Sequence, residues 1–126
     1  MARQLSPAFT DHRGAITDIV QHVPFDSATI ITCTPGAQRG NHYHKESVQW
    51  TYVIAGRLRA WKQDPDGPVT VEEITTGDLL ESPANQRHAF EAIEASTLLI
   101  LTRGPRGGQD YESDTFRVAP LWGNGA

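Results

Sequence analysis

Short runs of β-branched and aromatic residues alternate along the chain with turn-forming residues, a pattern typical of an all-β protein. Glycine and proline recur throughout, 11 and 8 times respectively, and leave little room for helices. The clearest turn, 64–68, combines aspartate, proline and glycine. The runs between turns predict strands at 16–20, 28–34, 38–44, 48–54, 57–62, 69–74, 78–82, 88–92 and 97–102. Many short strands at this regular spacing favour a sandwich or a barrel.

The predicted strand 48–54 carries bulky side chains on both of its faces. Side chains alternate along a strand, so Trp50 and Tyr52 would share one face while Thr51 and Val53 share the other. We therefore expect both faces to be covered. A barrel interior would cover one face, and a second sheet or a partner subunit would cover the other.

The strand pattern changes after residue 102. A stretch rich in glycine and arginine, 103–109, interrupts it, and the pattern returns over 111–118. The last residues, 119–126, are interpreted as a loose tail in which Leu121 and Trp122 could dock on the body. A length of 126 residues fits one domain. We expect a single domain over 1–126, with a core at about 9–118.

Composition and charge exclude several classes of protein. The one cysteine, Cys33, rules out an internal disulfide and cysteine-pair metal sites. A net charge of −4 argues against broad nucleic-acid binding, which needs a basic face. No apolar run approaches the ~20 residues of a membrane span, and the first residues lack the apolar core of a signal peptide. These features predict a cytoplasmic protein without nucleic-acid or membrane partners.

Three of the five histidines lie at positions where strands are predicted, so their side chains could share one face or one cavity. His42 and His44 are one residue apart, so on a strand both imidazoles would face the same side. His88 follows a predicted turn and opens another strand. An imidazole buried without a partner costs about 1–3 kcal/mol, and a shared metal ion would satisfy several at once. The spacing alone leaves two interpretations open, a metal site or ordinary polar residues. His12 and His22 are interpreted as surface residues.

Two spaced motifs that contain these histidines resemble the pair that defines the cupins. The first cupin motif is G-x5-H-x-H-x3–4-E-x6-G, and the matching residues here are Gly36, His42, His44, Gln49 and Gly56. The second is G-x5-P-x-G-x2-H-x3-N, and the matching residues here are Gly77, Pro83, Asn85, His88 and Ala92. Gln49 replaces a glutamate, Asn85 a glycine and Ala92 an asparagine. Asparagine tolerates the left-handed backbone that a glycine often adopts.

The resemblance implies an all-β fold, a small double-stranded β-helix or jelly-roll barrel, with a divalent metal ion inside. Carried over position by position, the metal ligands would be His42, His44, Gln49 and His88. The amide oxygen of Gln49 is a weaker ligand than the usual carboxylate and leaves the site one charge more positive. Such an imidazole-rich set suits Fe, Ni, Zn, Mn or Cu, so the ligands hardly restrict the identity of the metal.

The flanking sequence is similar to the cupins of deoxysugar and polysaccharide biosynthesis. It most resembles the nucleotide-sugar 3,4-ketoisomerases and the capsular-sugar cupin domains. The similarity rests on D-x-R-G at 11–14, R-G-x-H-x-H-K at 39–45 and Y-x-x-D-x-x-R at 111–117. His88 is a departure from the ketoisomerases, in which a complete set of metal ligands is not usual.

These features predict a metal-binding isomerase, epimerase or tautomerase that acts on a sugar or nucleotide-sugar ketone. A base would remove one proton beside the carbonyl, an acid would supply another, and the metal would hold the enediolate charge. The sequence does not identify the acid or the base. Two alternatives stay open: an Fe(II)-dependent dioxygenase acting on a small organic substrate, and a non-catalytic cupin that binds a sugar or a metal.

A nucleotide-sugar would need cationic partners for its diphosphate. The candidates are Arg39, Lys45 and Arg87, with Arg13, Arg57 and Arg59 also available. Arg39 is favoured because it belongs to the matched Arg-Gly motif. The expected partners are a small, carbohydrate-derived substrate and a second copy of the chain in a homodimer.

Overall fold

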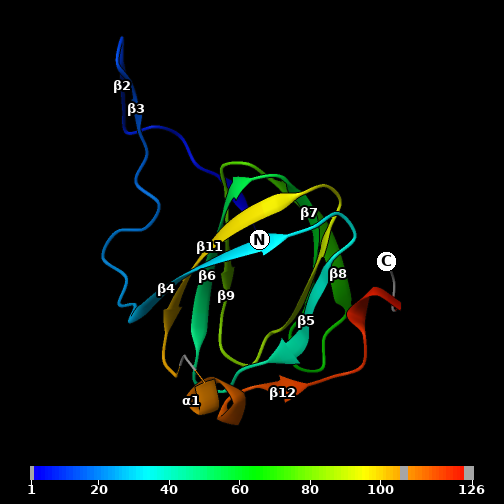
Figure 1. Ribbon diagram of the computed structural model, residues 1–126. Helices are drawn as coiled ribbons and strands as arrows, with labels where there is room; N and C mark the ends of the chain where they lie inside the picture. The colour runs from blue at the N-terminus through cyan, green and yellow to red at the C-terminus, as the bar shows by residue number, and fades with distance from the viewer. Residues whose placement is uncertain (1, 106–107, 124–126) are drawn as a thin grey trace.

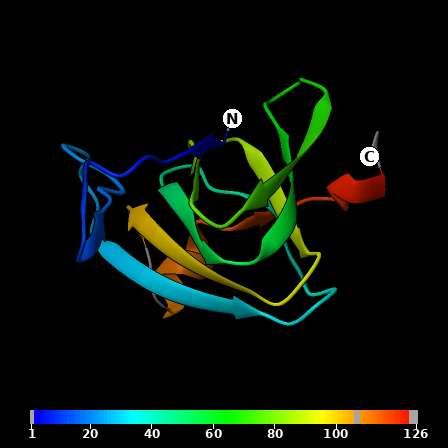
Figure 2. The ribbon, with the colours of Figure 1, turned by 90° about the horizontal axis from the view of Figure 1, so that it is seen from above.

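Two five-stranded antiparallel sheets face each other and form a small jelly-roll barrel in the computed structural model, which describes residues 2–105 and 108–123 (Figure 1). The first sheet contains, in order, β1 (Arg3–Gln4), β9 (Asp78–Ser82), β6 (Val48–Ala55), β11 (Ser96–Arg103) and β4 (Ser27–Cys33). The second contains β12 (Phe116–Arg117), β5 (Gln38–Tyr43), β10 (Arg87–Ala92), β7 (Arg57–Gln63) and β8 (Val69–Thr75). Seen from above, the two sheets enclose a common interior (Figure 2). The all-β fold expected from the sequence is confirmed.

Two of the predicted segments have a different structure. The expected strand 16–20 is wrong, because β3 (Gly14–Ile16) ends at Ile16. It pairs with β2 (Phe9–Asp11) in a hairpin that stands away from the barrel (Figure 1). The pattern at 111–118 is divided between the helix α1 (Gly108–Ser113) and β12. A short 3₁₀ turn, η1 (Leu121–Gly123), follows. Neither helical segment of the described chain has the length and apolar character of a membrane span.

The hydrophobic core lies between the two sheets. Its fully buried side chains include Val53 from β6, Leu58 from β7, Ile74 from β8 and Leu98 from β11. Each burial of this kind stabilises the fold by about 1.5–3 kcal/mol. Because every one of these strands contributes inward-facing residues, the core holds both sheets in register and supports the strands that carry the histidines.

Two tryptophans on the outer faces are covered by the ends of the same chain. Trp50, on β6, is 7% exposed and packs with Ile19 and Val20 of the N-terminal segment. Trp61, on β7, is 3% exposed and packs against Leu121 and Trp122, with the two indole centroids 5.7 Å apart. The cover on the outer face of β6 is therefore the chain's own N-terminal segment. Leu121 and Trp122 of the expected tail dock on the barrel, and 124–126 lie outside the described residues.

Candidate metal centre and cavity

Three histidines converge at one end of the barrel interior. β5 and β10 pair antiparallel with His42 opposite His88, and His44 follows directly after β5. The ring centroids lie 4.7 Å apart for His42 and His88, 4.9 Å for His42 and His44, and 5.4 Å for His44 and His88. One nitrogen from each ring falls within 4.8 Å of the others. The pairing of β5 with β10 thus brings His88 close to His42 and His44, although it lies far from them in the sequence.

The backbone of Gly40 allows this close pairing. Its φ is +99°, and a Cβ there would lie 2.7 Å from the carbonyl oxygen of His88. The β5–β10 register also shifts between His88 and Ala89, at a bulge. A side chain at residue 40 would push the two strands apart. Gly40 is therefore required for the approach of His42 to His88.

The site favours the neutral form of His88. His88 is 5% exposed, and burial, reinforced by the nearby His42 and His44, lowers its pKa to about 3. A neutral imidazole keeps a lone pair for a metal ion. The Nδ1 atom of His88 is buried without a hydrogen-bond partner among the residues that the structure describes. A cluster of three imidazoles with such an unsatisfied buried nitrogen fits a divalent metal ion.

Gln49 faces the same cavity from the opposite sheet. It lies on β6, is 8% exposed, and lines the cavity together with His42 and His88. Its neighbour Thr51 also lines the cavity, as expected from the alternation of side chains along β6. The structure thus brings Gln49 to the cavity that His42 and His88 line.

The cavity has a volume of about 380 Å³ and combines an apolar interior with a polar rim. Ile31, Leu98 and Ile100 supply apolar surface. Arg39 and Arg117 supply guanidinium groups, that of Arg117 in an exposed ion pair with Glu112 at 3.3 Å, and Tyr111 supplies a phenol. Such a space accepts a small molecule that carries both polar and anionic groups.

Of the predicted substrate-binding residues, Arg39 lines this cavity. Its Nη2 donates a hydrogen bond to the carbonyl oxygen of Thr32 at 3.1 Å, and its Nε lies 3.4 Å from Cys33 Sγ. These contacts hold the side chain in place. A guanidinium has five N–H donors in all, so it retains others for a ligand.

Lys45 and Arg87 take part in a stack on the outer face of the second sheet. The guanidinium of Arg87 lies 4.2 Å from the ring centroid of Tyr43, and Tyr43 stacks on Phe116 with centroids 5.3 Å apart. The ammonium of Lys45 lies 4.5 Å from the Phe116 ring. In the part of the chain that the structure describes, these two cations bind aromatic faces, and the residues that line the cavity do not include them.

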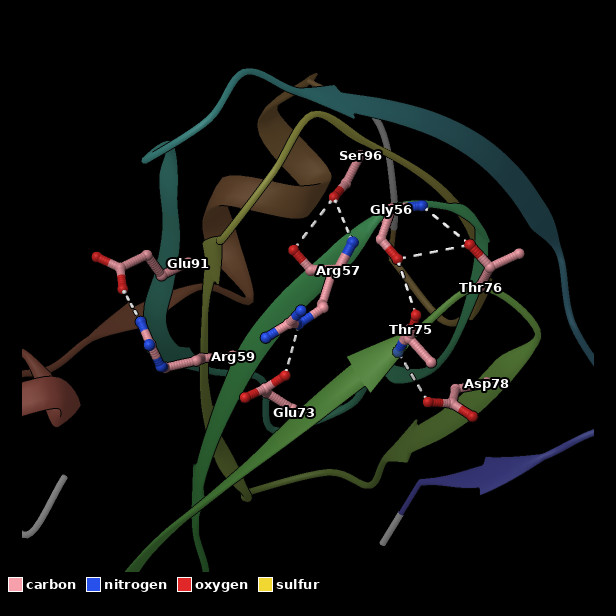
Figure 3. A network of polar contacts seen from close by, with 9 residues as sticks. All are labelled: Gly56, Arg57, Arg59, Glu73, Thr75, Thr76, Asp78, Glu91 and Ser96. Atoms are coloured by element: carbon pink, nitrogen blue, oxygen red, sulfur yellow. Dashed lines mark hydrogen bonds and ion pairs between the residues drawn. The ribbon is translucent and has the colours of Figure 1, made fainter.

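The other cationic candidates form ion pairs on the surface. Arg57 pairs with Glu73 at 2.6 Å and Arg59 with Glu91 at 3.2 Å, both on the outside of the second sheet (Figure 3). Arg13 pairs with Asp11 in the N-terminal hairpin. Arg39 is the one of the six candidates that the structure places at the cavity.

Three residues near the C-terminus belong to the site and were not singled out from the sequence as parts of it. The Tyr111 ring centroid lies 5.2 Å from that of His44, and Arg117 is paired with His42 across β12 and β5. The carbonyl oxygen of Asp114 lies 2.9 Å from His44 Nδ1. All three fall within the Y-x-x-D-x-x-R pattern at 111–117, the signal that could have identified them.

Asp114 is also the anchor of the turn after His44. Its carboxylate accepts hydrogen bonds from the backbone N–H groups of Lys45, Glu46 and Ser47. Desolvation is the largest single influence on its pKa and raises it, but the hydrogen bonds from Ser47, Lys45 and Glu46 together outweigh desolvation and lower the pKa. The carboxylate is therefore charged at neutral pH.

Comparison with known proteins identifies the family. The model of the cupin domain matches residues 29–102. The chain is 33% identical over 91 residues to an oxalate decarboxylase of Arthroderma benhamiae, a match that covers 72% of this chain and 20% of that protein. An oxalate decarboxylase of Bacillus subtilis is 29% identical over 75 residues, covering 60% and 20%. The chain thus spans about a fifth of the length of these curated relatives.

The solved structures that resemble this one share its fold. A sugar 3,4-ketoisomerase from Thermoanaerobacterium thermosaccharolyticum in complex with TDP superposes with a TM-score of 0.76 at 18% identity, covering 94% of this chain and 87% of that one. A dTDP-4-dehydrorhamnose 3,5-epimerase from Sulfolobus tokodaii gives a TM-score of 0.74 at 19% identity, covering 88% and 72%. Together with the match over 29–102, the two sheets and the converging histidines show that this chain belongs to the cupin domain family.

Proposed function

We propose that this cupin binds a divalent metal ion and acts as an isomerase, epimerase or tautomerase on a sugar or nucleotide-sugar ketone. The observation that carries the proposal is the cluster of His42, His44 and His88, because His42 and His88 line a cavity that two arginines also line. His42, His44 and His88 would hold the ion, with Gln49 as the fourth residue. A bound divalent ion supplies a Lewis acid that polarises a carbonyl oxygen.

The arginines of the rim suit an anionic substrate. Arg39 and Arg117 place two guanidinium groups at the cavity, and guanidinium forms paired hydrogen bonds with phosphate oxygens. In this proposal they bind the diphosphate of a nucleotide-sugar and leave the sugar ring to enter the cavity. The apolar surface of Leu98 and Ile100 then packs against the faces of the ring.

Delivery of the arriving proton is assigned to Tyr111. Moving a carbonyl along a sugar ring, or inverting a centre beside it, requires one proton to leave carbon and another to arrive. Tyr111 brings a phenol to the cavity wall beside His44 and His42. A phenol can donate a proton and, as phenolate, accept one. We assign it the role of acid, on the side of the substrate that faces α1.

Two proteins whose solved structures share this fold support this substrate class. One is a sugar 3,4-ketoisomerase in complex with TDP, and another is a dTDP-4-dehydrorhamnose 3,5-epimerase. These structures share the present fold over most of its length. A substrate of the same class is compatible with the volume of the present cavity and with the two arginines that line it.

A second candidate function follows from the curated relatives, both of which are oxalate decarboxylases. A small carboxylate would also suit a cavity with two arginines, and three imidazoles leave open positions on an ion for a chelating substrate. Decarboxylation of such an acid is the corresponding reaction, and an Fe(II)-dependent dioxygenase acting on a small organic substrate is a further alternative. A non-catalytic binding role is the remaining one, and it predicts tight binding of a sugar or a metal without turnover.

The decisive experiment measures turnover under nitrogen and in air. The protein is loaded in turn with each candidate metal and incubated with TDP-4-keto-6-deoxyglucose in D₂O. Isomerase chemistry predicts deuterium in the recovered sugar, at the same rate with and without oxygen. Release of CO₂ and formate from oxalate would favour the decarboxylase, and oxygen uptake with a small organic substrate would favour the dioxygenase. Metal content in His42→Ala and His88→Ala variants tests the site, and full occupancy in both would contradict it.

The assembly proposed is a homodimer, and the location proposed is the cytoplasm. Large apolar side chains remain exposed on the outer strands, with Ile30 on β4 at 57% and Val71 on β8 at 42%. Pairing of such faces between two copies would bury them. Sedimentation at several protein concentrations tests the dimer, because a monomer at all of them would contradict it.

A further inference from the structure

We infer that Asp114 is a positioning residue of the metal centre, because it selects which nitrogen of His44 keeps its lone pair for the ion. The inference rests on the proposed metal site and adds to it a residue outside the two motifs. Asp114 is 4% exposed and lies between α1 and β12, at the end of the barrel that carries the histidines. It contacts His44 and the three residues after it through different atoms.

The backbone of Asp114 fixes the tautomer of His44. The carbonyl oxygen of Asp114 lies 2.9 Å from His44 Nδ1, and a carbonyl oxygen can only accept a hydrogen bond. The proton of the neutral ring is therefore on Nδ1, and the lone pair is on Nε2. A hydrogen bond of this kind sets the orientation and basicity of a metal-binding imidazole. His44 is 3% exposed, so water does not compete with this bond.

The side chain of Asp114 fixes the backbone that carries His44. Its carboxylate accepts hydrogen bonds from the N–H groups of Lys45 at 3.0 Å, Glu46 at 3.2 Å and Ser47 at 3.0 Å. These three residues follow His44 directly. The hydroxyl of Ser47 lies 3.0 Å from the same carboxylate, and Ser47 is 1% exposed. Ring and turn are thus held by one residue, so neither can shift without the other.

Gly104 lies close to the turn 45–47. Gly104, which follows β11, has a φ of +108°, and a Cβ there would lie 3.1 Å from Ser47 Cα and 3.3 Å from the carbonyl oxygen of Glu46. The turn 45–47 is therefore packed between Gly104 on one side and the carboxylate of Asp114 on the other. Loss of the carboxylate would remove the hydrogen bonds that hold this turn, and with it the backbone next to His44.

Asp114→Asn tests the inference, with Asp110→Asn as its matched control. The amide of the variant puts one NH₂ group against a row of backbone donors, which disrupts the turn. Asp110 lies in α1, four residues before Asp114, is exposed, and undergoes the same change of charge. We expect Zn²⁺ binding, measured by competition with a chromophoric chelator, to weaken ten- to hundredfold in Asp114→Asn. In Asp110→Asn it should stay within twofold of the unmodified protein.

A second measurement separates positioning from a merely structural role. In the metal-free protein, the ¹⁵N shifts of His44 should show one tautomer with the proton on Nδ1, and Asp114→Asn should show a mixture. A single unchanged tautomer, or Zn²⁺ affinity equal to that of the unmodified protein, would overturn the inference even if the melting temperature fell. If Asp114→Asn does not fold, Ser47→Ala serves instead and should weaken Zn²⁺ binding severalfold, and unchanged binding would count against the inference.

Failure of the proposed function would be recognisable separately. If the unmodified protein binds none of the candidate metals, the proposed metal site is wrong. The tautomer of His44 in the metal-free protein still tests the role of Asp114. If the protein binds a metal but Asp114→Asn binds it equally well, the metal site stands and the inference about Asp114 is wrong.

Discussion

His42 and His88 lie opposite each other on β5 and β10, with ring centroids 4.7 Å apart and ring planes at 85°. The pairing joins the first motif to the second across 46 positions of sequence, from residue 42 to residue 88. The cavity therefore depends on the spacing between two strands as much as on the identity of the histidines.

Gly40→Ala should disrupt this pairing. A Cβ at residue 40 would clash with the His88 carbonyl oxygen at 2.7 Å, and overpacking of this kind costs about 1–3 kcal/mol. Urea denaturation and metal content measure the effect. Gly36→Ala is the control, because Gly36 also has a positive φ, +82°, but open space around its Cβ. Equal destabilisation by the two variants would show that the strand approach does not matter.

Arg39→Ala should weaken the binding of TDP, and Arg87→Ala should not. Arg39 lines the cavity, whereas Arg87 rests on the ring of Tyr43. A hydrogen bond to a charged group contributes about 1.5–3 kcal/mol, which corresponds to a loss of about tenfold or more in affinity. Isothermal titration calorimetry measures both variants. A loss in Arg87→Ala as large as in Arg39→Ala would contradict the assignment of the rim.

The metal-free protein should lose stability as the pH falls from about 6.5 toward 3. The pKa of His88 is lowered from 6.5 to about 3 in the folded protein, chiefly by burial. In that window the unfolded chain binds the proton and the folded protein does not, so acid favours unfolding. The slope for one such group is about 1.4 kcal/mol per pH unit. Urea denaturation of the unmodified protein and His88→Asn, both with chelator, measures it. An equally steep loss of stability in the variant would exclude His88 as the cause.

Trp122→Ala should destabilise the barrel and leave metal binding unchanged. Trp122 packs edge to face on Trp61 at 5.7 Å, and an aromatic pair of this kind contributes about 0.5–1.5 kcal/mol beyond the area it buries. Thermal unfolding measures the effect. Phe25→Ala is the control, because Phe25 is an aromatic residue that is 45% exposed. A loss of Zn²⁺ affinity in Trp122→Ala would mean that this end of the chain also shapes the site.

Motif spacing and strand alternation predicted much of the fold and part of the cavity. The strands from β4 to β11 fall within one or two residues of the expected ranges. Asn85 adopts the left-handed backbone expected of it, with a φ of 70°. His42, Gln49 and His88 face one cavity because the motif spacing reflects the strand geometry of the barrel.

The same alternation explains where the charged residues lie, with one exception. Lys45 and Arg87 are offset by one residue from His44 and His88, so their side chains face outward. Arg39 has the parity of Lys45 yet lines the cavity. The positive φ values of Gly40 and Asn41 interrupt the alternation between Arg39 and His42. A period-2 rule cannot anticipate such an interruption.

The contributions of the C-terminal segment could not be derived from local pattern. Tyr111 and Asp114 reach the site because α1 and β12 dock at the end of the barrel, next to β5 (Figure 1). That docking depends on contacts between residues about 70 positions apart, such as the bond between His44 and Asp114. The sequence pattern at 111–117 marks these residues but does not reveal what they touch.

The contacts that cover Trp50 and Trp61 limit how far this protein can be shortened without loss of its fold. The segment that matches the family, 29–102, contains all four proposed metal-binding residues. It lacks Ile19 and Val20, which pack on Trp50, and Leu121, which packs on Trp61. The segment also lacks Asp114, whose carbonyl oxygen contacts His44. A fragment trimmed to the family signature would keep every ligand while exposing two indoles, so in this protein the flanks are as much a part of the folding unit as the signature.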